Sequence, residues 1–184
     1  MATKTKLLTY DDYRTLPDDG NQYQIIGGEL IMSPSPTMIH QIISRNLFRV
    51  VDHYVSEKKL GEVLYSPADV VLSMRDVVQP DLMYISSNRL DIIAENNIVE
   101  APDLVVEILS EATRTTDRTS KKTLYQRYGV REYWIVDPVS QAIHQFTLLE
   151  DTFDLNDTFN SSQTLTSPTL EGFKLAVGKV FPNR

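Results

Sequence analysis

The sequence of 184 residues contains no cysteine. This absence excludes disulfide frameworks, thiolate metal sites and cysteine nucleophiles. No apolar run approaches the roughly 20 residues that a membrane-spanning helix needs, and the N-terminal MATKTKLLTYDDY lacks the apolar segment of a signal peptide. We therefore expect a soluble, cytoplasmic protein that does not contact a membrane.

Positive charge is scarce as well, with 18 Lys and Arg against 25 Asp and Glu and a formal net charge of −7. This balance argues against a protein that coats nucleic acid, because nonspecific affinity comes from neutralising phosphates. Six basic residues nevertheless lie between positions 114 and 131, beside a single acid. The segment is either a solvated helix face or a surface that meets phosphates. Its basic residues are Arg114, Arg118, Lys121, Lys122, Arg127 and Arg131.

Histidine is rare, with three in the chain. His53 and His144 stand alone, without the short spacing to other ligands that zinc sites show. We therefore expect no zinc site.

Apolar residues suffice for a packed core, since 41% of the chain is hydrophobic and 23% is charged. Such a composition is typical of globular chains, not disordered ones. The length lies in the usual range of a single domain, and no internal repeat, linker or low-complexity segment is evident. We therefore expect one domain over residues 1–184.

Helix signals occur in four segments. Thr9 is suited to cap a short helix over 9–16, and a second short helix is expected over 87–93. Ser35 as N-cap and Pro36 at the first position predict a long helix ending near Gly61. Asp117 is suited to cap a helix over 117–128.

Strand signals lie between and after these helices. Gly27-Gly28 is a two-residue turn of the kind that tight hairpins require. The order of elements predicts an α/β (α+β) fold in which helices pack on a mixed sheet. The predicted strands are 22–26 and 29–32 around this turn, then 62–66, 69–74, 81–86, 104–109, 132–136, 142–148 and 173–177.

One carboxylate lies in the middle of a strongly apolar strand, in the sequence APDLVVEILS at 101–110. Because strand side chains alternate between faces, Glu107 shares a face with Asp103. At about 3.3 Å per residue the two are roughly 13 Å apart, too far to share one metal ion. Glu107 therefore needs a partner from another element.

Asp81 is a candidate partner, since it introduces the apolar strand in VQPDLMYIS at 78–86. If the two strands pair, Asp81 and Glu107 converge, and their burial and mutual repulsion are unfavourable. A hard divalent cation such as Mg²⁺, or a shared proton, would relieve both costs. The alternatives for Glu107 are a salt bridge to a nearby Arg and a position in water at the open end of the strand.

Several motifs occur in a characteristic order: Pro80-Asp81, PDLVVEILS at 102–110, DRTSKKTLY at 117–125 and YGVREYWIVDP at 128–138. With YQIIGGELIMSPSPTMIHQ before them, the chain resembles the putative restriction-endonuclease domain family of the PD-(D/E)XK nuclease superfamily over nearly its whole length. The resemblance implies a restriction-endonuclease-like central mixed β-sheet flanked by helices, with an N-terminal helix and β-hairpin. It also implies cleavage of DNA with Mg²⁺ or Mn²⁺ as cofactor.

The resemblance further implies a set of site residues. Asp81 and Glu107 would ligate Mg²⁺ together with the backbone carbonyl of Ile108. The superfamily's usual lysine position is Leu109 here, whereas the resembled family carries its lysine in the following helix, where Lys121 matches. Arg118 and Lys122 would contact flanking phosphates, because basic side chains neutralise phosphate charge. The expected site residues are therefore Asp81, Glu107 and Lys121 for catalysis, Asp81, Glu107 and Ile108 for the metal, and Arg118 and Lys122 for nucleic acid.

The spacing of four residues places Asp117, Lys121 and Tyr125 on one helix face. Lys121 would there stabilise charge on the phosphoryl group or orient the attacking water. Without the resemblance, a lysine on an amphipathic helix is more often simply solvated.

The chain departs from the family pattern in the hairpin, where Gln24 and Gly27 replace an acidic pair that the family often shows. A second metal ligand from the hairpin is therefore left open. Glu29 remains as a possible accessory residue at the mouth of the site. His40 matches a family histidine and either approaches the site or is an ordinary polar residue near a helix N-terminus.

Two functions follow from these patterns. The first is a Mg²⁺-dependent DNA endonuclease, for which a homodimer is plausible because cutting both strands requires two active sites. The second is a catalytically inactive nuclease-fold protein that binds DNA or another protein, which the missing hairpin acids and the overall acidity favour. A glycosidase with two carboxylates is a weaker alternative, because no aromatic sugar-binding cleft is evident.

Overall fold

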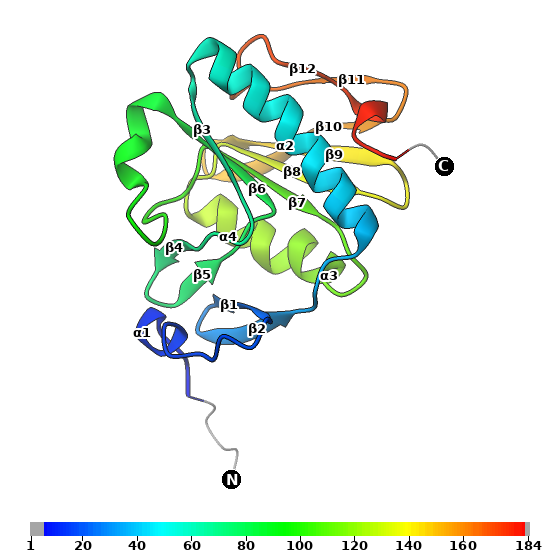
Figure 1. The fold of residues 1–184 in the computed structure, drawn as a ribbon. Coiled ribbons are helices and arrows are strands. Elements are labelled where there is room, and N and C mark those ends of the chain that lie inside the picture. The colour runs from blue at the N-terminus through cyan, green and yellow to red at the C-terminus, as the bar shows by residue number, and fades with distance from the viewer. Residues whose placement is uncertain (1–5, 183–184) are drawn as a thin grey trace.

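The computed structural model describes residues 6–182. A six-stranded sheet forms its centre, with the strand order β10-β9-β8-β7-β6-β3 (Figure 1). β7 and β8 pair in parallel, and the other neighbours in this sheet pair antiparallel, so the sheet is mixed as predicted. The strands are β3 (Gly61–Tyr65), β6 (Leu82–Ser86), β7 (Leu104–Ile108), β8 (Glu132–Asp137), β9 (Ala142–Leu149) and β10 (Thr152–Asn160).

Helices cover both faces of the central sheet (Figure 1). The long helix α2 (Met38–Lys58) packs four buried residues against one face, at three- and four-residue spacing. The opposite face is covered by a continuous helical segment formed by α3 (Arg114–Thr116), a π-helical turn (Asp117–Lys121) and α4 (Lys122–Arg127). The buried residues of α2 are Ile43, Leu47, Val51 and Val55.

The alternation of side chains along β7 decides which helix each residue meets. Leu104, Val106 and Ile108 belong to the apolar cluster beneath α2, whereas Val105 belongs to the cluster beneath α4. Glu107 therefore faces α4 and the π-helical turn, where a polar partner can reach it.

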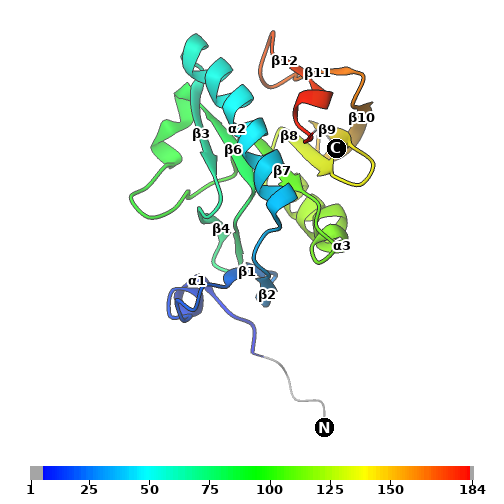
Figure 2. The same ribbon diagram turned by 45° about the vertical axis from the view of Figure 1, so that its right-hand side comes forward.

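A second, four-stranded sheet with the order β2-β1-β5-β4 lies at one end of the molecule (Figure 2). The turn between its first two strands uses Gly27 and Gly28 at φ of 61° and 84°, a left-handed conformation that favours glycine. β5 leads within three residues to Asp81 and β6, so this sheet is joined directly to the central one. Its strands are β1 (Gln22–Ile26), β2 (Glu29–Ser33), β4 (Val70–Ser73) and β5 (Asp76–Val78), and α1 (Tyr10–Tyr13) precedes them.

The C-terminal part returns to the α2 face of the central sheet. It contains the two-stranded sheet β11 (Thr164–Thr166) and β12 (Lys174–Ala176) and the short 3₁₀ helix Val177–Lys179; another 3₁₀ helix, Ser87–Ile92, follows β6. The buried carboxylate of Glu132 holds this part in place by accepting hydrogen bonds from the Ser167 hydroxyl at 2.6 Å and the Thr169 backbone N–H at 3.0 Å.

The helix caps correct two predictions. Thr37, not Ser35, caps α2, because the Thr37 hydroxyl accepts a hydrogen bond from the backbone N–H of His40. Asp117 is not an N-cap but lies inside the helical segment. Ser110 and Thr113 start that segment earlier, since each hydroxyl accepts the other's backbone N–H. Thr9 caps α1 as predicted.

Three strands were not predicted: Asp76–Val78, Thr152–Asn160 and Thr164–Thr166. The first and last have three residues each, and the second is largely exposed, so neither length nor apolar alternation marks them. Within the described range, no helix combines the length and apolarity needed to cross a membrane.

Candidate active site

Asp81 stands immediately before β6, at the point where β6 and β7 meet. β6 and β7 run antiparallel with Leu82 opposite Val106, so the start of one strand adjoins the end of the other. The backbone N–H of Ile108 donates a hydrogen bond of 2.7 Å to Asp81 Oδ2. The local pairing thus brings Asp81 to the strand that carries Glu107, as the sequence predicted.

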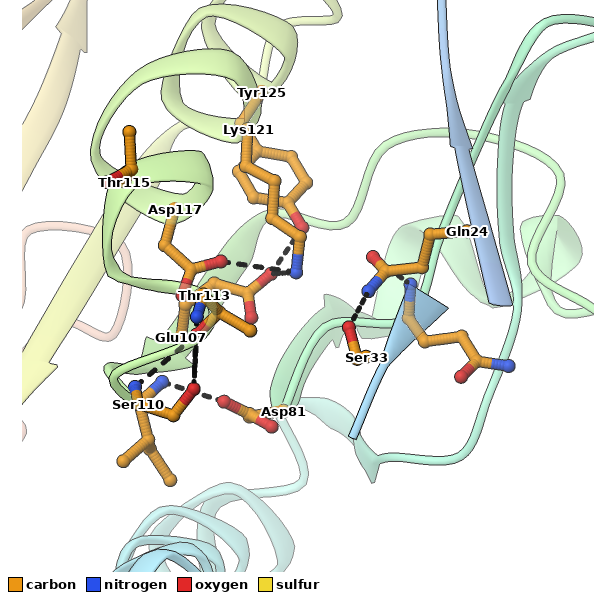
Figure 3. Close-up of polar contacts among 12 residues, drawn as sticks. Gln24, Ser33, Asp81, Glu107, Ser110, Thr113, Thr115, Asp117, Lys121 and Tyr125 are labelled. Carbon is orange, nitrogen blue, oxygen red and sulfur yellow. Dashed lines mark hydrogen bonds and ion pairs between the residues drawn. The ribbon is translucent and has the colours of Figure 1, made fainter. Parts of the chain in front are cut away.

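Glu107 is 2% exposed and points toward the helical segment (Figure 3). Its Oε1 atom accepts hydrogen bonds from Lys121 Nζ at 2.9 Å and from the Tyr125 hydroxyl at 2.6 Å. Burial raises the pKa of Glu107 to about 8; the Lys121 ammonium opposes this rise, and the charges of Asp117 and Asp81 add to it. Asp81 accepts a hydrogen bond from the N–H of Ile108, the residue after Glu107, so the two carboxylates lie near each other.

Lys121 projects from the π-helical turn and is 3% exposed. Its ammonium contacts Glu107 and lies 3.4 Å from Asp117 Oδ1. Burial alone would lower the pKa of Lys121, but the two carboxylates raise it, so the side chain stays charged. The common face predicted for Asp117, Lys121 and Tyr125 is confirmed, although a π-helical turn lies within it.

His40 approaches the same place from α2. Its Nε2 atom lies 3.1 Å from Asp81 Oδ2. Burial lowers the pKa of His40, but Asp81 and Glu107 raise it more, so the net direction is upward. The position near the site, one of the two alternatives left by the sequence, is the one observed.

The β1–β2 hairpin borders the site through the middle of β1 and the C-terminal end of β2. Gln24 and Ser33 line a small pocket of about 30 Å³ together with Asp117 and Lys121. The Gln24 amide is fixed on both sides, because it donates to Ser33 Oγ and accepts the backbone N–H of Gln79. Glu29 lies next to the hairpin turn, exposed and outside the lining of this pocket.

The two residues expected to bind phosphates have protein partners. Arg118 lies 3.3 Å from Asp137 Oδ2, and Arg114 makes a two-pronged contact with the same carboxylate at 3.0 and 3.1 Å. The Lys122 ammonium lies 4.0 Å from the centre of the Phe146 ring.

Sequence reasoning missed the partners Asp137 and Ser33. Neither carries a local signal beyond the VDP turn at 136–138, because each contact joins residues far apart in the sequence.

The donor set fits a hard cation such as Mg²⁺. Within residues 6–182 no group of three or more His, Cys, Asp or Glu side chains is placed to hold a metal, which leaves the two carboxylates Asp81 and Glu107. In the described contacts, Asp81 and Glu107 each use one oxygen, Oδ2 and Oε1, and keep the other available. Mg²⁺ commonly binds through one or two carboxylates and keeps several waters, so two carboxylates and a backbone carbonyl suffice.

Comparisons with known proteins agree with this architecture. A solved structure described as "a putative nuclease belonging to DUF820" from Anabaena variabilis ATCC 29413 superposes with a TM-score of 0.80, covering 95% of this chain and 97% of that chain at 19% identity. At this identity the likeness shows a shared fold, the nuclease fold expected from the sequence. No curated protein matches the chain. The model of the Uma2 family, described as "Putative restriction endonuclease", matches residues 10–178, and the chain belongs to this family.

Proposed function

We propose that the protein is a Mg²⁺-dependent endonuclease that hydrolyses phosphodiester bonds in DNA, with Mn²⁺ as an alternative cofactor. The observation that supports this most is the convergence of Asp81, Glu107 and Lys121 from the residue before β6, from β7 and from the π-helical turn. A family described as restriction endonucleases is consistent with it. We also propose that residues 1–184 act as one domain.

Each residue of the site has a role that its contacts allow. The bound cation would polarise the phosphoryl oxygen and lower the pKa of a bound water. Asp81, Glu107 and the Ile108 carbonyl would hold that cation, and Tyr125 orients Glu107 through its hydroxyl. Lys121 would place its ammonium beside the charge that develops on the phosphoryl group.

His40 would restrain Asp81, since its ring nitrogen lies 3.1 Å from the carboxylate. Arg118 and Lys122 would contact phosphates that flank the scissile bond, with Arg118 exchanging Asp137 for a phosphate. A homodimer would supply the two sites needed to cut both strands.

Substitution of the two carboxylates tests the proposal. Asp81→Asn and Glu107→Gln should each abolish saturable Mn²⁺ binding in calorimetry and cleavage of plasmid DNA. Asp103→Asn is the matched control. Asp103 directly precedes β7 and is also buried, but its carboxylate pairs with Arg89 and Arg131. The variant should keep Mn²⁺ binding if its circular dichroism shows a folded protein.

Two results would contradict the proposal in different ways. Undiminished cleavage by either carboxylate variant would remove Asp81 and Glu107 from the chemistry. The second result is that the unmodified protein binds DNA or a protein without binding Mn²⁺ or cleaving DNA. That result would support an inactive nuclease-fold binding protein.

A further inference from the structure

The ammonium of Lys121 has two carboxylate partners of different kinds. The nearer, Glu107 Oε1 at 2.9 Å, belongs to a proposed metal ligand. The other, Asp117 Oδ1 at 3.4 Å, lies four residues earlier on the π-helical turn and has no part in the proposed metal site. The inference below rests on the proposed function.

Asp117 has unused capacity to accept a hydrogen bond. Its side chain is 1% exposed, and its Oδ1 atom has the Lys121 ammonium at 3.4 Å but no hydrogen bond from the described residues. A buried carboxylate oxygen with a long ion pair and no hydrogen bond is only partly compensated for its desolvation. Such an atom would be stabilised by a closer approach of its donor.

The pocket beside Asp117 can receive such a donor. Its volume of about 30 Å³ exceeds the roughly 10–15 Å³ that one water, or a group of similar size such as an ammonium, requires. Asp117 and Lys121 both line it, and Thr113, Gln24 and Ser33 supply polar atoms around it (Figure 3). A short movement of the Lys121 side chain would therefore bring the ammonium fully onto Asp117.

A divalent cation on the free oxygen of Glu107 would favour this movement. An ammonium at 2.9 Å from the same carboxylate would repel the cation, and burial leaves little water to screen the repulsion. Lys121 is 3% exposed, so departure into solvent would require the helical segment to open. Asp117 offers an anionic partner without that opening.

We propose that Asp117 is a positioning residue that accepts the Lys121 ammonium when a divalent cation binds Glu107. It thereby keeps the lysine in the site beside the substrate and lowers the competition between lysine and metal for Glu107. Without Asp117 the ammonium would have Glu107 as its remaining carboxylate partner and would oppose metal binding.

A double-mutant cycle on Mn²⁺ affinity tests this proposal. Calorimetry with Mn²⁺ alone is carried out on the full chain and on Asp117→Asn, Lys121→Met and the double variant. Asp117→Asn should weaken Mn²⁺ binding about tenfold, a coupling within the usual range for groups in contact. In the Lys121→Met background the same substitution should change affinity no more than about twofold, because the competing ammonium is gone.

Controls separate this effect from general loss of negative charge or of fold. Asp137→Asn removes another buried carboxylate, paired with Arg114 and Arg118 instead of Lys121, and should change Mn²⁺ affinity about equally in both backgrounds. Thermal unfolding confirms that each variant is folded. If Asp117→Asn does not fold, Asp117→Ser, which leaves space for water, takes its place in the cycle.

The outcomes distinguish the inference from the proposed function. An equal or larger loss of Mn²⁺ affinity in the Lys121→Met background would overturn the positioning role while leaving the metal site in place. Absence of saturable Mn²⁺ binding to the unmodified protein would overturn both.

Discussion

A single buried carboxylate, Glu107, organises this site at the scale of residues. Strand alternation and the expected pairing of two strands indicated Asp81 as a partner of Glu107. Lys121 was predicted from the resemblance to the nuclease family, and the four-residue spacing placed it on one helix face with Asp117 and Tyr125. The sequence did not allow the Gln24–Ser33 contact or the use of Asp137 by two arginines to be predicted. Those contacts depend on how separate elements pack, for which a local pattern carries no signal.

The Tyr125 hydroxyl gives a prediction at this scale. At about pH 9, above the pKa of about 8 of Glu107, Tyr125→Phe should lower the free energy of unfolding by about 2 kcal/mol, because the 2.6 Å hydrogen bond then goes to a buried charged acceptor. Tyr84→Phe is the matched control: its hydroxyl donates to the neutral backbone carbonyl of Leu60 at 2.9 Å, and its loss should cost about 1 kcal/mol. Urea unfolding followed by fluorescence measures both. Equal losses would mean that Glu107 is not charged when it accepts the Tyr125 hydrogen bond.

Secondary-structure elements were predicted in proportion to the strength of their local signals. The hairpin followed from Gly27-Gly28, and both of its strands appear within one residue of the predicted bounds. The π-helical turn was not predicted, because it lies where Lys121 contacts Glu107 of β7, and this tertiary contact leaves no local signal. The sequence therefore predicted which residues share a face of this helix but not that the helix contains a π-helical turn.

The helical segment is attached to β8 by the ion pairs of Arg114 and Arg118 with Asp137, and these give a prediction at the scale of elements. Burial alone would raise the pKa of Asp137, but the Arg114 hydrogen bonds lower it more, so the net direction is downward. The stabilisation is then fully present above the ordinary Asp pKa of about 4 and is lost as the pH falls through the lower folded value. Asp137→Asn should cost about 1 kcal/mol at pH 6, allowing for the partial exposure of Arg114, and progressively less below about pH 4.

Urea unfolding at several pH values checks this prediction. Asp154→Asn, at an exposed position on β10, is the control and should show little cost at any pH. If Asp137→Asn lowers the free energy of unfolding more at lower pH, the ion pair with Arg114 is not the source of the loss.

At the scale of the whole molecule, charge distribution limits how DNA can be bound. The net charge is −7, and the basic segment is largely paired internally. Arg114 and Arg118 contact Asp137, Lys121 contacts Glu107, and Arg131 contacts Asp103. The sequence revealed the basic segment but not these partners, so it overstated the positive charge available to a ligand. We expect weak DNA binding in the absence of divalent cations, with few phosphate contacts.

The salt dependence of DNA binding tests where those contacts lie. Arg118→Ala and Lys122→Ala should each reduce the slope of log affinity against log salt by about 0.9, because each lost phosphate contact releases one counterion fewer. Lys58→Ala should leave the slope unchanged, since Lys58 lies at the other end of α2, roughly 27 Å from His40 at 1.5 Å per residue. Fluorescence anisotropy with a double-stranded oligonucleotide, without divalent cations, gives all three slopes. Equal slopes for the three variants would mean that Arg118 and Lys122 make no phosphate contacts. DNA would then have to reach Glu107 over a different surface.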